Sequence, residues 1–222
     1  MSNRDPINIL KTMVYICNLA PGKILVCGGA ILHPTLLGLP RVRPYSDDID
    51  FFIPKSSTLE KIRKKCSLGE MMGTPYSLIN GVYAFLFVNR IKDLSLKETE
   101  FNPIVFSTNE GLVYTLPLEL IAALKLRRGI VRASSGFSTR RGTIFYGKDI
   151  IDSSGLVNLG NPESFADYMN RYTYNSCGLN EPYICARDFS SHPAVSNLHP
   201  SYRGGAEKII YTLRNTPCRF SI

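Results

Sequence analysis

The sequence predicts an α+β fold, a mixed sheet flanked by helices and followed by a mainly helical C-terminal part. Of its 222 residues, 44% are hydrophobic, which is enough for a packed core. The short apolar runs typical of strands all lie between residues 23 and 115. From residue 117 the apolar spacing becomes helical. We therefore divide the chain into a sheet domain, 1–116, and a helical region, 117–222.

The sheet domain begins with a helix. Asp5 is a typical N-cap, Pro6 suits the first helical position, and apolar residues recur at helical spacing over 9–17. Strands are expected wherever short apolar runs lie between turn residues, at 23–27, 48–53, 82–89, 104–107 and 112–115. The last two flank a turn and predict a hairpin.

Further helices follow from capping and periodicity. A capping box from Ser57 to Glu60 predicts a helix over 57–68. Later helices are expected from 117, from 148, over 163–172 and over 205–214. Residues 69–81 and 129–143 are rich in turn formers and are expected to form loops.

The sequence also excludes several classes of protein. Its longest apolar stretch, 24–39, is interrupted by glycine, histidine and proline, so we expect no membrane span and no membrane partner. The N-terminus has no signal-peptide pattern, and the six cysteines show no C-x-x-C spacing, which predicts reduced thiols and a cytoplasmic location. Cys177, Cys185, His192 and His199 are possible zinc ligands, but their gaps do not fit zinc-finger spacing, so no zinc site is expected.

The charge balance indicates a phosphate-bearing partner. Lys and Arg number 26 against 18 Asp and Glu, for a net charge of +8. Between residues 120 and 148 the chain has basic residues and no acid: Lys125, Arg127, Arg128, Arg132, Arg140, Arg141 and Lys148. Such a run attracts nucleic acid, although a solvated basic face would show the same composition.

Two short motifs, a Gly-Gly turn and an Asp-x-Asp strand, together indicate a chemical function. Gly28 and Gly29 follow the first predicted strand, and the next strand begins Asp48-Ile-Asp50. Because side chains alternate along a strand, the two carboxylates share one face, where a cation between them would relieve their repulsion. Mg²⁺ binds one or two carboxylates together with substrate phosphates, and a Gly-Gly turn lets backbone N–H groups approach a triphosphate.

This pattern resembles the DNA polymerase beta-type nucleotidyltransferases, and among them the AbiEii/AbiGii-type toxins and their MenT-like relatives. The resemblance covers residues from about 23 to 156. It rests on four short motifs: Gly28-Gly29, Arg43-Pro-Tyr-Ser46-Asp-Asp48-Ile-Asp50, Lys125-Leu-Arg-Arg128 and Lys148-Asp-Ile-Ile-Asp152.

The resemblance implies a nucleotidyltransferase-type sheet and a Mg²⁺-dependent enzyme that moves NMP from an NTP to a hydroxyl, such as an RNA (tRNA) 3′ end. It further implies a toxin with a cognate antitoxin. Two Mg²⁺ ions would bind Asp48 and Asp50, while Gly28, Gly29 and Ser46 would hold the triphosphate. The helical region would complete the nucleotide site, with Lys125 and Arg128 neutralising phosphate charge and Asp152 ordering them, through either Lys148 or Lys125.

Two departures from the family pattern leave alternatives open. Eighteen residues separate Gly29 from Asp48, so the loop around 36–44 is longer than usual. The third carboxylate of the family is expected at Asp93, with Glu98 and Glu100 as runners-up. If Asn89 held that strand position, the chain would be an inactive module that binds nucleotide or RNA. A third possibility is transfer to a protein or a small molecule.

Overall fold

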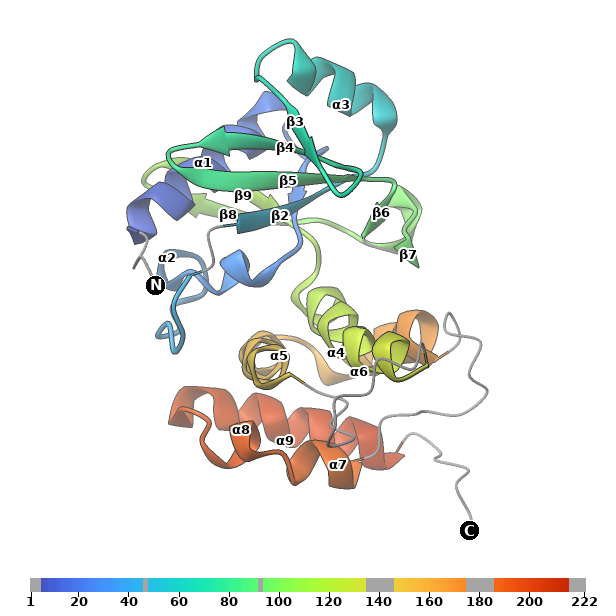
Figure 1. The fold of residues 1–222 in the computed structure, drawn as a ribbon. Coiled ribbons are helices and arrows are strands. Elements are labelled where there is room, and N and C mark those ends of the chain that lie inside the picture. The colour runs from blue at the N-terminus through green and yellow to red at the C-terminus, as the bar shows by residue number, and fades with distance from the viewer. Residues whose placement is uncertain (1–4, 46–47, 92–93, 135–145, 175–185, 216–222) are drawn as a thin grey trace. The chain divides into compact units, whose positions relative to one another are not determined.

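The computed structural model describes residues 5–45, 48–91, 94–134, 146–174 and 186–215 (Figure 1). The chain forms two compact units, Met1–Pro117 and Leu118–Ile222. The first unit contains all of the described strands, and the second contains only helices. The predicted α+β fold, with a mixed sheet, flanking helices and a helical C-terminal part, is confirmed.

The first unit is built on a seven-stranded mixed sheet with the order β3-β4-β5-β2-β1-β9-β8 (Figure 1). Its strands are β1 (Leu25–Val26), β2 (Asp48–Ile53), β3 (Gly69–Met71), β4 (Thr74–Ile79), β5 (Val82–Val88), β8 (Ile104–Thr108) and β9 (Gly111–Thr115). The pairs β2–β5 and β1–β9 are parallel, and the others are antiparallel. A separate two-stranded sheet pairs β6 (Arg90–Ile91) with β7 (Leu94–Ser95).

Helix α1 (Pro6–Leu19) covers one face of this sheet and begins where the sequence predicts. The Asp5 carboxylate accepts from the backbone N–H of Ile7 at 3.0 Å, and Pro6 is the first helical residue. The helix packs against β5 and β9, and its residues Met13, Ile16 and Cys17 are fully buried. The remaining helical segments of this unit are η1 (Gly29–Leu32), α2 (Pro34–Leu37), α3 (Ser56–Arg63) and η2 (Glu98–Glu100).

Two predictions for residues 57–81 are wrong. Helix α3 begins at Ser56, after Lys55, which makes no side-chain cap, and it ends at Arg63 instead of near 68. The expected turn region 69–81 forms strands β3 and β4. The overlooked signal was Asn80-Gly81, which lies between two apolar runs. Both residues have positive φ, at 53° and 74°, as a tight hairpin turn requires.

The second unit consists of helices around α5 (Gly147–Leu159), which packs on both α4 (Leu118–Ser134) and α9 (Pro200–Asn215). The shorter segments are α6 (Pro162–Tyr168), the π-helix η3 (Met169–Tyr174), α7 (Ala186–Ser190) and α8 (Pro193–Ser196). Helix α4 continues to Ser134, so the loop expected from residue 129 begins later. None of the helices in the described ranges is long and apolar enough to cross a membrane.

Candidate active site

The two predicted metal-binding carboxylates begin strand β2. Asp48 and Asp50 are half-buried, whereas the intervening Ile49 and the following Phe51 are almost fully buried on the opposite face. This is the alternation expected of a strand with one face in the core. The two carboxylates therefore share one sheet face, which is accessible at the start of β2, whereas Phe52, farther along the same face, is fully buried.

The Gly28-Gly29 turn lies directly against Asp50. The backbone N–H of Cys27 donates to the Asp50 carbonyl at 2.9 Å. A Cβ atom on Gly28 would lie only 2.9 Å from Oδ2 of Asp50, so no larger residue fits here without moving the carboxylate. Gly28 has a φ of −109°, so space, and not backbone conformation, requires glycine. The two motifs, separated by 18 residues in the chain, are in contact.

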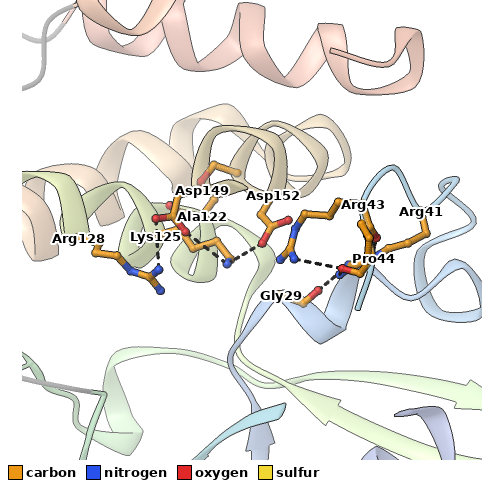
Figure 2. A network of polar contacts seen from close by, with 10 residues as sticks. Gly29, Arg41, Arg43, Pro44, Ala122, Lys125, Arg128, Asp149 and Asp152 are labelled. Atoms are coloured by element: carbon orange, nitrogen blue, oxygen red, sulfur yellow. Dashed lines mark hydrogen bonds and ion pairs between the residues drawn. The ribbon is translucent and has the colours of Figure 1, made fainter. Parts of the chain in front are cut away.

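The long loop between them is folded back onto the glycines by Arg41 (Figure 2). Arg41 Nη1 donates to the Gly29 carbonyl at 2.9 Å, and Nε donates to the Arg43 carbonyl at 2.8 Å. The guanidinium also lies 4.4 Å from the ring centroid of Tyr45. Arg41 was not predicted, because an arginine in a Pro- and Gly-rich loop gives no sign of which carbonyls it will bind. Ser46, the third predicted triphosphate ligand, lies outside the described residues.

No third carboxylate faces Asp48 and Asp50 on the neighbouring strand β5. The parallel register pairs Asp48 with Tyr83 and Asp50 with Phe85. Asn89 follows β5 with a φ of 56° and is not part of that strand. The described ranges contain no group of three or more His, Cys, Asp or Glu side chains placed so that they could hold a metal ion together.

The three candidates for the third acid have different outcomes. Asp93 lies outside the described residues. Glu98 forms an ion pair with Lys55 at 2.9 Å, and Glu100 accepts from the backbone N–H of Lys97 at 2.9 Å. Both glutamates lie in η2, and their part in a metal site stays a prediction. The described site is a pair of carboxylates beside a glycine, a donor set that suits Mg²⁺ completed by water and phosphate oxygens.

In the second unit, Lys125 and Arg128 of α4 lie against two acids of α5 (Figure 2). Lys125 Nζ is 2.8 Å from Asp152 Oδ2 and 3.9 Å from Asp149 Oδ1. Arg128 Nη1 is 3.4 Å from Asp149 Oδ2. Both aspartates are buried. Asp152 thus orders Lys125 across the helix pair, which is one of the two expected routes, and Lys148 is exposed.

Asp149 is a member of this network that the sequence analysis did not single out. It is one of two acids in the Lys-Asp-x-x-Asp segment, and spacing alone does not tell which of them faces α4. Three members of the expected basic run are similarly tied to the fold. Besides Lys125 and Arg128, the buried Arg127 donates to the Tyr172 carbonyl at 3.0 Å. Arg140 and Arg141 lie outside the described residues.

The two histidines considered as zinc ligands act as helix caps. Nδ1 of His192 accepts from the backbone N–H of Ala194 at 3.1 Å, and Nδ1 of His199 accepts from that of Ser201 at 3.2 Å. Cys177 and Cys185 lie outside the described residues. Cys17 is equally unsuited to chemistry: burial raises the pKa of its thiol to about 12, so the nucleophilic thiolate is scarce at neutral pH.

Comparisons with known proteins find solved structures that resemble this chain. One of them is the crystal structure of an antigenic nucleotidyltransferase-like protein from Paracoccidioides brasiliensis, 18% identical, with a TM-score of 0.47, over 82% of this chain and 97% of that one. No protein-family model matches, and no curated protein matches. A TM-score below 0.5 does not establish a shared fold, so the assignment of function rests on the residues described above.

Proposed function

We propose that this protein is a Mg²⁺-dependent nucleotidyltransferase that moves NMP from an NTP to a hydroxyl acceptor, at an RNA 3′ end such as that of tRNA. The observation that carries the proposal is the contact between Gly28 and the Asp50 carboxylate. The glycine leaves space for the Asp50 carboxylate directly beside the turn. Two carboxylates on one strand face next to backbone N–H groups suit a cation and a phosphate chain.

Each residue has a defined task in this proposal. Asp48 and Asp50 hold Mg²⁺, which supplies charge neutralisation for the phosphates when it is bound. The backbone N–H groups at Gly28 and Gly29 orient the triphosphate, and Arg41 fixes the position of the turn through the Gly29 carbonyl. Lys125 and Arg128 neutralise negative charge as pyrophosphate leaves, a role implied by the family resemblance.

The test is nucleotide transfer by wild type and by Asp50→Asn. Each α-labelled NTP is incubated with Mg²⁺ and total RNA, and label is then sought on RNA, on protein and on small molecules. We expect labelled RNA with the wild type and a loss of at least about a thousandfold in Asp50→Asn, since the substitution removes a metal ligand in a charge-stabilised step. Asp5→Asn, a change of the same kind at the cap of α1, serves as the control. Unchanged transfer by Asp50→Asn would overturn the site assignment.

A second candidate function is supported by the register of β5. Tyr83 and Phe85 occupy the positions beside Asp48 and Asp50 where a third acid would stand. A chain lacking that acid would bind NTP and RNA without transferring the nucleotide. NTP binding without any labelled product, with Mg²⁺ and Mn²⁺ alike, would favour this inactive module. Label on protein or on a small molecule would instead change the acceptor and keep the enzyme.

A role as a toxin adds one consequence to the proposal. Expression of the wild-type chain in cells should arrest growth, and expression of Asp50→Asn at the same level should not. A partner protein that restores growth would then be the antitoxin. Equal growth of the two strains would remove the toxin role and leave the nucleotidyltransferase proposal standing.

A further inference from the structure

The sheet face that bears Asp48 and Asp50 continues as a surface of aromatic side chains. Tyr83 and Phe85 pair in register with the two aspartates, and on the next strand Tyr76 pairs with Phe85. The three ring centroids lie 5.5–6.3 Å from one another. Leu78, which pairs with Tyr83, is 58% exposed and extends the surface. We name Tyr76, Leu78, Tyr83 and Phe85 the aromatic surface.

The alternation along β5 separates this surface from the core. Val82, Ala84 and Leu86 are fully buried, whereas Tyr83 and Phe85 are only half-buried. At the other end of the row, the Tyr76 ring covers Gly69, where a Cβ would lie 2.7 Å from a ring carbon. The Tyr76 ring thus packs over Gly69 and is tilted by 63° from the Tyr83 ring and by 47° from the Phe85 ring. Aromatic rings are the side-chain groups on which nucleobases stack.

Positive charge lies next to the aromatic surface. A hollow of about 560 Å³ is lined by Lys65, Gly69, Tyr76 and Leu78 among others, so a lysine and two members of the surface share one depression. A second hollow, of about 600 Å³, is lined by residues 63–70 and Pro75 and includes both Lys64 and Lys65. Both lysines are exposed, and neither forms an ion pair within the described part of the chain. Of the three consecutive basic residues 63–65, only Arg63 forms an ion pair in the described part of the chain, with Glu60 at 3.2 Å.

We infer that the aromatic surface and Lys64 and Lys65 bind single-stranded RNA, with bases stacked on the rings and phosphates at the lysines. Stacking platforms beside positive charge are the physical basis of single-strand binding, and stacking tolerates any base. Strands are spaced about 4.8 Å apart, so Tyr76 lies about 10 Å from Asp50 across the sheet. The terminal nucleotides of a strand lying on the rings can therefore reach the carboxylates. RNA binding by this surface does not depend on the proposed function. Only the identification of the bound RNA as the acceptor of the nucleotide rests on it.

The test is binding of a fluorescein-labelled, mixed-sequence 12-nucleotide RNA, measured by anisotropy without NTP or Mg²⁺. Tyr76→Leu keeps an apolar side chain and removes the ring, so we expect at least about fivefold weaker binding. Lys64→Ala with Lys65→Ala should weaken binding and lower the slope of log affinity against log salt by about 1.4, for two lost phosphate contacts. A duplex of the same sequence should bind more weakly than the single strand, because its bases are already stacked with one another.

Matched variants separate binding from folding and from catalysis. Tyr211→Leu changes a tyrosine that is 69% exposed on α9, and Lys11→Ala with Lys23→Ala removes two exposed lysines elsewhere; both should bind like wild type. Thermal melts check that each variant is folded. Asp50→Asn should retain RNA binding even where transfer is lost, so failure of the proposed function and failure of this inference are distinguishable. Wild-type affinity in Tyr76→Leu, or a wild-type dimer that Tyr76→Leu dissociates, would overturn the inference.

Discussion

Every histidine of this chain precedes a proline and caps a helix. Nδ1 of His33, His192 and His199 each accepts the backbone N–H two residues ahead, and the proline between them occupies the first helical position. An imidazole can accept at Nδ1 only when it is neutral there. The cap formed by the buried His33 therefore depends on its imidazole staying neutral.

His33 should make stability depend on pH. Its ring is buried, Nδ1 accepts from the Thr35 N–H at 3.2 Å and Nε2 donates to the Pro6 carbonyl at 3.1 Å. Burial lowers the pKa of this imidazole below its ordinary value of about 6.5. The unfolded chain thus binds the proton more readily, so the free energy of unfolding falls as the pH drops through 6.5 toward the folded-state value.

Urea unfolding between pH 5.5 and 7.5 measures this dependence. His33→Asn keeps a cap acceptor and cannot be protonated in this range, so its stability should change less with pH than that of the wild type. The corresponding change at the exposed cap, His199→Asn, serves as the matched control, because it also replaces a capping imidazole by an amide. Identical pH profiles for wild type and His33→Asn would show that His33 does not set the dependence.

Gly28 lets the Asp50 carboxylate lie directly against the Gly28-Gly29 turn. In Gly28→Ala the new methyl group would lie 2.9 Å from Asp50 Oδ2, so the carboxylate must move. Misplacement of a catalytic group by about 1 Å lowers rates by up to about a hundredfold. We expect transfer to fall by at least about tenfold while the fold persists. The measurement is single-turnover transfer with saturating NTP, alongside thermal melting.

The control for this change is Gly147→Ala at the start of α5. There a Cβ would make an ordinary contact, 3.6 Å from Ala194. Its transfer rate should match that of the wild type. Full activity of Gly28→Ala would mean that the close approach of the turn to Asp50 has no part in function.

At the scale of elements, α5 and α9 pack closely enough to require glycine. A Cβ on Gly205 would overlap the Ser154 backbone carbonyl of α5. The neighbouring Gly204 faces only the Asn158 side-chain oxygen, 2.7 Å from the Cβ position, and that side chain can move aside. The two glycines are neighbours in α9, but a side chain on Gly205 would clash with backbone, whereas a side chain on Gly204 would clash with a side chain that can move.

Gly205→Ala should therefore separate α5 from α9 and destabilise the protein by about 1–3 kcal/mol or more. Gly204→Ala should be neutral or stabilising by up to about 1 kcal/mol, because alanine favours the helix over glycine by roughly that amount. Chemical denaturation of the two variants side by side measures the difference. Equal free energies of unfolding would mean that α5 and α9 can move apart to accommodate the Gly205→Ala methyl group without loss of stability.

The buried ion pairs between α4 and α5 should contribute more to stability than exposed ion pairs would. Lys125 is only 11% exposed and Asp152 is fully buried. Removal of one partner from a buried pair destabilises by about 3–5 kcal/mol, whereas an exposed pair contributes about 0–1 kcal/mol. Lys125→Met should thus lower stability substantially as well as weaken NTP use.

A double-mutant cycle resolves this coupling. Asp152→Asn in the Lys125→Met background should restore part of the lost stability, because it neutralises a buried carboxylate. Lys148→Met, at an exposed position one turn from Asp152, should change stability by no more than about 0.5 kcal/mol. Additive effects of Lys125→Met and Asp152→Asn would show that the 2.8 Å contact stores no coupling energy.

At the scale of the whole molecule, the chain is two units with separate cores. The first core is centred on β2 and β5, and the second on the face of α5 that meets α4 and α9. Because each unit buries its own apolar residues, an opening motion in one can leave the amides of the other protected. Substitutions in the core of one unit should therefore act locally.

Hydrogen exchange tests this independence. Gly205→Ala should speed amide exchange throughout α5 and α9, and the exchange rates of β2, β5 and α1 should stay at wild-type values. The reverse experiment uses Ala84→Leu on β5, which overfills a fully buried position in the first unit. Uniform acceleration over both units in either variant would show that the chain unfolds as one cooperative body.

The sequence determined what depends on local pattern. Short apolar runs between turn residues located β2 and β5, and helical spacing with Asp5 and Pro6 located α1. The Asp-x-Asp strand predicted two carboxylates on one face, which is where Asp48 and Asp50 lie. These properties follow from the geometry of one strand or one helix. The same local reasoning misread residues 57–81, because it passed over the Asn80-Gly81 turn signal.

Only the tertiary structure decided which residues meet. Gly28 touches Asp50, Arg41 binds the Gly29 carbonyl, Lys125 pairs with Asp152, and Phe85 stands beside Asp50. Each contact joins segments whose separation in the chain says nothing of their distance in space. Strand order and register fix such contacts, and these depend on how all the strands bury their apolar faces together. The residues alone thus predicted the carboxylate pair, and the family resemblance implied that Gly28 and Gly29 lie at the same site. The contacts of Arg41 with Gly29 and of Tyr83 and Phe85 with the carboxylate strand became known only from the folded chain.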